Sequence, residues 1–433
     1  MKTERSGTIV QTLWRLLAVG AVLLFACTGF SEEDSNGENV QVGTPEISVD
    51  TLDAIRSRLS TNETDEAISL ANSFIDQLEE EWSRFDPILV EPLLLLGDGL
   101  RKNGEYVDAL DTYDRARHVS RLAHGLHSIE QLDAVYREAD TYHELGQIGR
   151  ATDRHEYAYG INIRSHGEDA VELLPGLFEL AEWYLEVRNV FAARGLFDDA
   201  LKITKENLER TDPNNIRALK GLAMSYRHER FTTPGEIVIE DEFTDQSTSA
   251  DENVPTYKAE VNRFAPGEEA LKELVEIEQE RTASTVESLA YTKLDLADWY
   301  LLFDKVQLAD VVYRDIWAMF VDESNAQFLR KEFSEPMPLY YPLARSPEPQ
   351  PQADLVEPIE GTIELKFSVD SEGLVTDVSV ESVAPDDRFV EEFVAAMEEA
   401  RYRPVMRDGQ RTSRDGVILT HEYIFFPDVN GGE

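Results

Sequence analysis

Histidine and carboxylate side chains are the groups in this chain that could carry out chemistry, but their spacing does not favour catalysis. His118, His124 and His127 lie close together without a cysteine or carboxylate at the spacing of a zinc site. Adjacent acids such as Glu391 and Glu392 are typical of a solvated helix face, and no pair stands apart as acid and base. The sequence also lacks a Gly-x-Ser-x-Gly nucleophile motif, a Gly-Lys-Ser/Thr phosphate loop and a His-Glu-x-x-His metal motif. We therefore expect no enzymatic activity, no metal and no cofactor.

Cys27 is the single cysteine, so the chain cannot form an internal disulfide. It follows an apolar run of 11 residues, 16–26, and Lys2, Arg5 and Arg15 lie ahead of that run, an order typical of a secretory signal. The run is well short of the roughly 20 residues that a membrane-spanning helix needs. Export from the cytosol is therefore the favoured interpretation.

Residues 24–27, Leu-Phe-Ala-Cys, resemble the bacterial lipobox, whose cysteine is lipidated and becomes the mature N-terminus. The resemblance implies a signal peptide over residues 1–27, a lipid on Cys27 and a polar tether over residues 28–50. It implies an outer-membrane lipoprotein on the periplasmic side of the bacterial envelope, because Thr28 is not the Asp that favours inner-membrane retention in that family. An ordinary cleaved signal and an uncleaved inner-membrane anchor remain open as alternatives.

Composition limits the class of partner. The chain of 433 residues has room for two or three domains and carries a formal net charge of −44. Because that charge would repel phosphate groups at every approach, the sequence excludes nucleic acid as a partner.

Residues 51–333 repeat a pattern of small and apolar side chains with a period of 42 residues. Each copy has apolar residues at i, i+3, i+4 and i+7 in two segments of about 14 residues with a Gly or polar break between them, which predicts a pair of helices. Gly97, Ala109 and Ala116 occupy positions where a large side chain would hold the paired helices apart. We expect Ala109→Leu to overpack the pair and to cost about 1–3 kcal/mol of stability. Three copies read Leu93, Gly97, Ala109 and Tyr113; Val135, Ala139 and Ala151; and Leu177, Ala181, Ala193 and Phe197.

This spacing resembles the tetratricopeptide repeat in its 42-residue form. Because one repeat cannot bury its apolar face alone, the resemblance implies an α-helical solenoid of about six stacked repeats. Solenoids of this family bind peptides or proteins along the concave face that the first helices make, and mixed charges with aromatic residues suit a protein partner better than a small metabolite. The family positions of that groove correspond here to Tyr136, Asp140, His143, Phe178, Glu182, Lys220, Met224 and Arg227.

An acidic insertion, residues 231–265, interrupts the fifth repeat. The first helix of this repeat is predicted over residues 215–228, and the helical pattern resumes after Pro266. The polar, aperiodic insertion is interpreted as a solvated loop. A lid over the solenoid groove and a weak divalent-cation site are the alternatives, although the Asp-x-Asp-x-Asp-Gly ligand pattern is missing.

The chain changes character after residue 333. Prolines crowd residues 334–358, which predicts a stiff, extended linker at a domain boundary. In residues 359–427 we expect a small α+β domain with one helix on a three-stranded antiparallel sheet, and a short tail at 428–433. Its predicted elements are strands at 363–369 and 374–381, a helix from near Asp386 to Pro404, and a third strand at 417–426.

Eight residues in and just before this domain have characteristic types and spacing: Tyr341, Pro342, Gly361, Gly373, Arg401, Tyr402, Pro404 and Gly409. They resemble the C-terminal domain of TonB. In that family the domain binds a short extended segment of outer-membrane transporters by adding it to a sheet edge, where unpaired N–H and C=O groups template another strand. The resemblance implies such binding here. We expect the third strand to be the edge, with Val417, Leu419, His421, Tyr423 and Phe425 along it.

These features favour a non-enzymatic adaptor of the cell envelope. The solenoid would hold one periplasmic partner, and the TonB-like domain would engage an outer-membrane transporter. A second hypothesis is an energy transducer of the TonB family that supports transmembrane transport through a retained N-terminal anchor. TonB itself has an inner-membrane helix that couples to a proton-driven motor, and here an exported N-terminus and a solenoid take its place. A third hypothesis is a structural scaffold that self-associates through the C-terminal edge strand.

Overall fold

The computed structural model describes the helical repeats and the C-terminal domain. Every described residue belongs to one compact unit, residues 49–433. Cys27, the polar tether up to residue 48, nearly all of the insertion and the tail lie outside the described residues. In the described ranges no helix is both long and apolar enough to cross a membrane. These ranges are 49–231, 264–320, 326–342 and 359–425.

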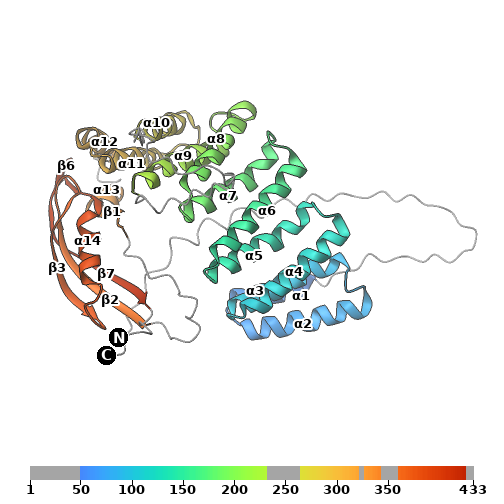
Figure 1. The fold of residues 1–433 in the computed structure, drawn as a ribbon. Coiled ribbons are helices and arrows are strands. Elements are labelled where there is room, and N and C mark those ends of the chain that lie inside the picture. The colour runs from blue at the N-terminus through green and yellow to red at the C-terminus, as the bar shows by residue number, and fades with distance from the viewer. Residues whose placement is uncertain (1–48, 232–263, 321–325, 343–358, 426–433) are drawn as a thin grey trace, which may run out of the picture. The chain divides into compact units, whose positions relative to one another are not determined.

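Helices α1 to α12 form six consecutive pairs in the described part of the chain (Figure 1). Helices α9 and α10 pack against each other although the insertion separates them in sequence, so the fifth repeat is complete. The predicted solenoid of about six repeats is therefore confirmed. The pairs are α1 Val49–Ser60 with α2 Thr64–Glu81, α3 Val90–Lys102 with α4 Tyr106–His124, α5 Leu132–Glu144 with α6 Ile148–His166, α7 Leu174–Glu186 with α8 Val190–Asn207, α9 Pro213–Phe231 with α10 Phe264–Glu280, and α11 Val286–Leu302 with α12 Val306–Met319.

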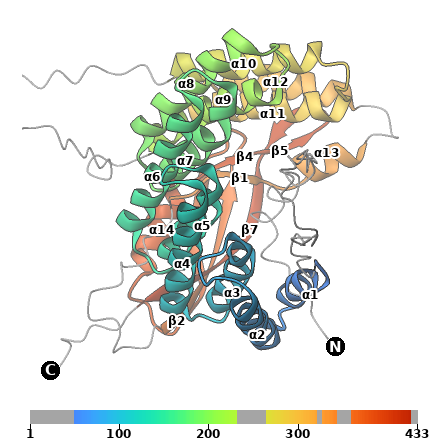
Figure 2. The same cartoon turned by 90° about the vertical axis from the view of Figure 1, so that its right-hand side faces the viewer.

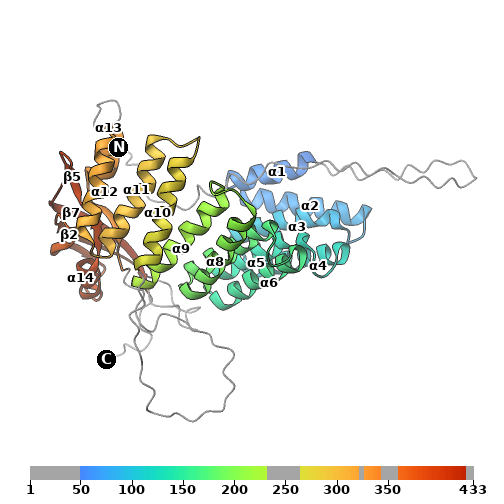
Figure 3. The ribbon, with the colours of Figure 1, turned by 90° about the horizontal axis from the view of Figure 1, so that it is seen from above.

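Short elements complete the repeat region. Turns of 3-10 helix, η1 Pro87–Leu89, η2 Ile129–Gln131 and η3 Val171–Leu173, precede the first helices of the second, third and fourth pairs. Helix α13, Ala326–Phe333, follows the sixth pair (Figure 3). Helix α10 begins two residues before Pro266, which a first helical turn tolerates because its N–H would have no intrahelical partner there.

Small residues hold the helices of each pair close together. Ala109, Ala151 and Ala193 recur at the 42-residue period, and each is completely buried. Gly221 of α9 allows a similarly close contact between neighbouring repeats, because a β-carbon there would lie 2.1 Å from Cε1 of Phe197 in α8. The expectation that these positions need small side chains is therefore confirmed by the packing.

The C-terminal domain has the predicted composition of one helix and a three-stranded antiparallel sheet. The strand order is β3-β2-β7, with β2 in the centre. Ile363, Leu365 and Phe367 of β2 alternate toward the core, where Phe393 and Met397 of α14 cover them. The elements are β2 Ile359–Val369, β3 Val375–Ala384, α14 Val390–Glu399 and β7 Arg414–Phe425.

Two short ribbons were not predicted. Strand β1, Met337–Tyr340, pairs antiparallel with β4, Arg401–Arg403 (Figure 2). Strand β5, Val405–Arg407, pairs with β6, Gln410–Thr412. The prediction of a stiff, extended linker over residues 334–358 therefore needs correction at residues 337–340, which are extended but pair with β4. A two-stranded ribbon leaves one side of β1 unpaired and so tolerates Pro338. Residues 343–358 lie outside the described part of the chain.

Candidate functional site

Strand β7 lies at one edge of the three-stranded sheet, and β3 lies at the other. Among the described strands β7 pairs only with β2. Along an antiparallel strand, alternate residues direct their N–H and C=O groups away from the paired neighbour. The predicted third strand therefore has the position that strand addition requires.

The two edges differ in regularity. The pairing of β2 with β7 is regular from Ile359 opposite Phe425 to Phe367 opposite Val417, and its one register shift lies beyond Phe367, near Gly416 with a φ of +68° at the start of β7. The pairing of β2 with β3 shifts register twice, once between Glu364 and Leu365 and again two residues later. In β3, Asp377 also has a positive φ of 54°. Bulges of this kind twist an edge and interrupt its row of backbone groups, so β7 is the better template for an added strand.

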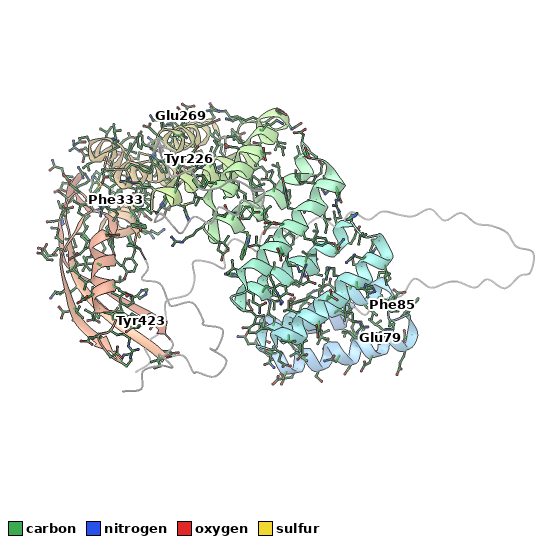
Figure 4. The ribbon with its side chains drawn as sticks, viewed as in Figure 1. Glu79, Phe85, Tyr226, Glu269, Phe333 and Tyr423 are labelled. Atoms are coloured by element: carbon green, nitrogen blue, oxygen red, sulfur yellow. The ribbon has the colours of Figure 1, made fainter. Side chains whose placement is uncertain are left out.

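The side chains of β7 alternate between the two faces of the sheet. Tyr423 is buried against Phe393, with ring centroids 5.0 Å apart (Figure 4), and His421 lies 5.0 Å from the same ring. Val417 and Leu419 pack against the same core, and Phe425 pairs with Ile359 through the backbone. On the opposite face Ile418 is 58% exposed. Val417, Leu419, His421 and Tyr423 thus anchor β7, and the residues between them, 418, 420 and 422, are exposed.

Two motif glycines give close approaches that a side chain would block. Gly361 lies opposite Tyr423, and a β-carbon on it would be 2.3 Å from Cζ of that ring. Gly373 has a φ of +82°, and a β-carbon on it would be 2.1 Å from the carbonyl oxygen of Tyr402. These glycines are therefore needed for the backbone path of the domain.

The other motif residues hold the domain together locally. Tyr341 lies beside β7, with its ring 5.9 Å from that of His421, and burial raises the pKa of Tyr341. The ring of Tyr402 packs 5.4 Å from Phe367. The guanidinium of Arg401 donates only to the carbonyl oxygens just before it, those of residues 399 and 400. The remaining three residues are Pro342, half-buried; Pro404, buried between β4 and β5; and Gly409, which has a φ of +73° in the turn between β5 and β6.

Arg403, within the stretch 401–404 that resembles TonB, makes a contact with the repeat region that the sequence did not predict. Its side chain is buried and forms a bidentate pair with Asp298 of α11, with Nε 3.0 Å from Oδ1 and Nη2 2.6 Å from Oδ2. Nη1 lies 2.8 Å from Oε2 of Glu332 in α13. Burial opposes the charge of Arg403, but attraction to Asp298 outweighs it and raises the pKa of the guanidinium above its usual value. No sequence signal links Arg403 to Asp298, which are 105 positions apart.

The predicted groove residues lie on the first helices of three repeats. First helices of neighbouring repeats contact one another, as α1 does α3, α3 does α5 and α7 does α9. The exposed members are His143, Glu182, Lys220 and Met224, and the half-buried members are Tyr136 and Asp140. These six remain candidates for partner contact.

Phe178 does not belong to this surface. It is completely buried between α7 and α8, where its ring centroid lies 6.4 Å from that of Phe197. The guanidinium of Arg217 covers the remaining side at 4.5 Å from the ring centroid. The prediction of an exposed Phe178 is wrong because this position points into the helix pair.

Arg227 is not available to an external partner either. Its Nη2 donates to the carbonyl oxygen of Leu339 in β1, and burial lowers the pKa of its guanidinium. Next to it, Phe231 at the end of α9 stacks on Tyr340 with ring centroids 3.9 Å apart. The chain's own strand β1 therefore covers the C-terminal end of the row of first helices.

Ion pairs cross the row of first helices at successive steps. Their partners are mostly half-exposed, so each pair stabilises the stack only modestly. Many charges of this surface are thus already paired within the chain. The pairs are Arg56 with Glu91 at 2.7 Å, Arg137 with Asp98 at 2.9 Å, His143 with Glu186 at 3.7 Å, and Arg217 with Glu182 at 2.6 Å.

Two of the three neighbouring histidines, His118 and His127, make contacts with other side chains. The ring of His118 packs edge-on against Phe85 at 6.1 Å, and Nδ1 of His127 lies 2.8 Å from Nη1 of Arg164. Over the described residues, no group of three or more His, Cys, Asp or Glu side chains is placed to hold a metal ion.

Comparison with known proteins identifies the C-terminal region. Residues 351–423 match the protein family described as Gram-negative bacterial TonB protein C-terminal. No curated protein matches the chain in sequence. A solved structure with nearly identical TPR-like repeats of the kinesin light chain type, from Podosopora anserina, is 15% identical with a TM-score of 0.41, and the match covers 54% of this chain and 96% of that chain. The structure of BtubC (BKLC) from P. vanneervenii is 14% identical with a TM-score of 0.41, and that match covers 67% and 95%.

The chain therefore combines a solenoid of TPR-like helix pairs with a domain similar to the C-terminal domain of TonB. Domains of both kinds generally bind other proteins. The family match also associates the C-terminal domain with the envelope of Gram-negative bacteria.

Proposed function

We infer that this protein is a non-enzymatic adaptor of the bacterial envelope. Its C-terminal domain captures an extended segment of a partner along β7, and its solenoid holds a second protein on the first helices α5 and α7. The observation that supports this proposal is the edge of β7 from residue 417 to 425, where the pairing to β2 is regular, whereas two register shifts interrupt the pairing of the other edge strand, β3.

An added strand would continue the existing sheet. Its backbone would pair with the outward N–H and C=O groups of β7, which supplies affinity without a fixed sequence. Specificity would come from side chains that reach the exposed row of Ile418, Thr420 and Glu422 on one face. By resemblance to the TonB family, the expected partner segment is the periplasmic plug segment of an outer-membrane transporter.

The solenoid would bind its partner away from the end that β1 covers. The exposed His143 and Glu182 and the half-buried Tyr136 lie on α5 and α7, where no described strand packs. The ring of His143 is already fixed edge-on against Trp183 at 5.2 Å, which reduces the entropy lost when a partner orders it. A partner surface with aromatic and basic groups would complement the side chains of Tyr136, His143 and Glu182.

Membrane attachment through a lipid on Cys27 completes the proposal. It would hold the adaptor at the outer membrane, close to the transporters. Mass spectrometry of the mature N-terminus tests this part by itself. A diacylglyceryl group on Cys27 supports the adaptor, whereas an intact Met1 supports an energy transducer with a retained anchor.

Site-specific photo-crosslinking in living cells tests the binding edge. A photoreactive residue at Ile418 on β7 should capture a partner, and the same residue at Val380 on β3 is the matched control because both positions are exposed and apolar. We expect a crosslink to an extended segment of an outer-membrane transporter from position 418 alone. Equal yields at the two positions, or crosslinks only between copies of this chain, would contradict the proposal.

A further inference from the structure

Two buried tyrosines occupy equivalent places in the second and sixth repeats. Tyr113 in α4 donates to Oδ1 of Asp98 at 2.8 Å, and Tyr313 in α12 donates to Oδ1 of Asp298 at 2.6 Å. In both pairs the aspartate lies 15 positions before the tyrosine, on the first helix of the same repeat. Both tyrosines are completely buried. In both repeats, therefore, an aspartate carboxylate that accepts a tyrosine hydrogen bond is available to the element that packs next to the repeat.

The next element supplies an arginine in each case. In the second repeat, Nε of Arg137 on α5 lies 2.9 Å from Oδ1 of Asp98, which joins that repeat to the first helix of the third. In the sixth repeat, Nε of Arg403 on β4 lies 3.0 Å from Oδ1 of Asp298. The same atom of the same residue type thus meets the equivalent carboxylate oxygen, but it comes from the C-terminal domain.

Surrounding contacts make this second arrangement the more buried one. Glu332 of α13 adds a second carboxylate, and Arg403 is only 6% exposed. Phe333, labelled in Figure 4, packs edge-on against Tyr313 at 5.9 Å and lies at the same distance from the guanidinium of Arg403. An arginine so enclosed needs both acids, because a buried charge without a partner is strongly unfavourable.

Other contacts between the C-terminal domain and the sixth repeat surround this cluster. Nε of Arg411 in β6 lies 3.1 Å from Oδ1 of Asp310 in α12. Leu301 of α11 approaches Gly373, whose β-carbon would lie 3.1 Å from it. Strands β1 and β4 both contact α11. The C-terminal domain therefore covers the apolar side of the sixth repeat, which an exposed last repeat would leave in water.

We propose that the C-terminal domain docks on the solenoid in the manner of a next repeat, through the same kind of arginine–aspartate–tyrosine cluster that joins the second repeat to the third. Arg403 is the residue that holds β4 to α11 and α13. The TonB-like domain is thus an integral end of the solenoid instead of a module on a free tether. This inference is independent of the partner that β7 binds.

A nicking experiment on the full chain tests the docking. A protease recognition site inserted within residues 343–358, between β1 and β2, allows the folded protein to be cut into a solenoid half with β1 and a second half with β2 to β7. We expect the wild-type halves to elute together in size-exclusion chromatography. Arg403→Met should weaken their association at least about 100-fold, because it leaves Asp298 and Glu332 without their buried cation.

Arg401→Met is the matched control. Arg401 lies two positions away on the same strand and bonds only to nearby carbonyl oxygens, so its halves should associate as tightly as those of the wild type. If uncut Arg403→Met fails to give the circular dichroism spectrum of the wild type, Asp298→Asn decides, and we expect at least about 10-fold weaker association for it. Wild-type halves that separate, or Arg403→Met or Asp298→Asn halves that bind like the wild type, would overturn the proposal.

Discussion

The ring of Tyr113 on α4 packs directly over the backbone of Gly97 on α3, so that a β-carbon built on Gly97 would lie 2.3 Å from Cε1 of the ring. The ring itself cannot move away easily, because it is completely buried and its hydroxyl is bound to Asp98. Close contacts of this type set the distance between the two helices of a repeat. They also make the repeat sensitive to a single methyl group.

Gly97→Ala should therefore destabilise the solenoid by about 1–3 kcal/mol, because the methyl group overpacks the contact with Tyr113. Urea unfolding followed by circular dichroism measures the change. Gly195→Ala is the control, since a β-carbon there meets nothing within 4 Å and replacing Gly in a helix contributes about 0.5–1 kcal/mol of stability. Equal effects of the two substitutions would contradict the packing described for Gly97.

Glu138 on α5 is a buried carboxylate between two arginines. Nε of Arg117 lies 2.9 Å from Oε1, and Nε of Arg154 lies 2.8 Å from Oε2 without the alignment of a hydrogen bond. Glu138→Gln should cost about 3 kcal/mol, the lower end for breaking a buried ion pair, because Arg154 keeps access to water. Chemical denaturation measures it. Glu144→Gln, in an exposed pair with Arg101, should change stability by less than about 1 kcal/mol.

The C-terminal domain should lose stability as the pH falls. Burial lowers the pKa of His421 below its ordinary value. A histidine with a lower pKa in the folded than in the unfolded state contributes stability above its unfolded pKa, and this contribution is lost as the pH falls through its folded pKa. Hydrogen exchange of the β2 backbone amides, measured between pH 7.5 and about 5, reports on the stability of this domain separately from the solenoid. His421→Gln should make the stability of β2, as read from its amide exchange, less dependent on pH. The same pH dependence as in the wild type would contradict this role of His421.

The histidine prediction has a simple control. His124, at the end of α4, is exposed and lies outside the C-terminal domain. His124→Gln should leave the pH dependence of exchange in β2 as it is in the wild type. A flattened profile in this variant would mean that the effect reflects total charge.

Proline substitutions at two adjacent positions of β7 should separate folding from binding. Ile418 and Leu419 lie opposite Lys366 and Leu365, and one of the two directs its N–H toward β2 while the other directs it outward. One of Ile418→Pro and Leu419→Pro loses the outward N–H and keeps the N–H that faces β2. That variant should have a melting temperature closer to that of the wild type, and it should still fail to bind a synthetic peptide of the partner segment. Two variants that both retain the partner would contradict strand addition at β7.

The repeats are readable from sequence because their cause is local. Ala109, Ala151 and Ala193 recur at one period, and each has to be small for the same packing reason. The topology of the C-terminal sheet follows in the same way from alternation in β2 and a turn at Gly373. The repeat packing and the hairpin of β2 with β3 depend on neighbours within about 40 positions.

Contacts between distant segments could not be predicted. Leu339 accepts from Arg227, which is 112 positions away, and this contact removes Arg227 from the predicted groove. The burial of Phe178 was not predicted either. The sequence places it correctly on a first helix, but its side chain is buried between α7 and α8 instead of facing the groove. The proline pattern also hid β1, because Pro336 and Pro338 are typical of a linker and only pairing with β4 makes the segment a strand.

Amide hydrogen exchange of the full chain, with and without a synthetic peptide of the segment crosslinked at Ile418, tests the central claim most directly. We predict that binding slows exchange at the outward amides of β7 between residues 417 and 423, while the amides of β3 are unchanged. A bound peptide that leaves the exchange of β7 unaltered, or that protects β3 instead, would contradict the account.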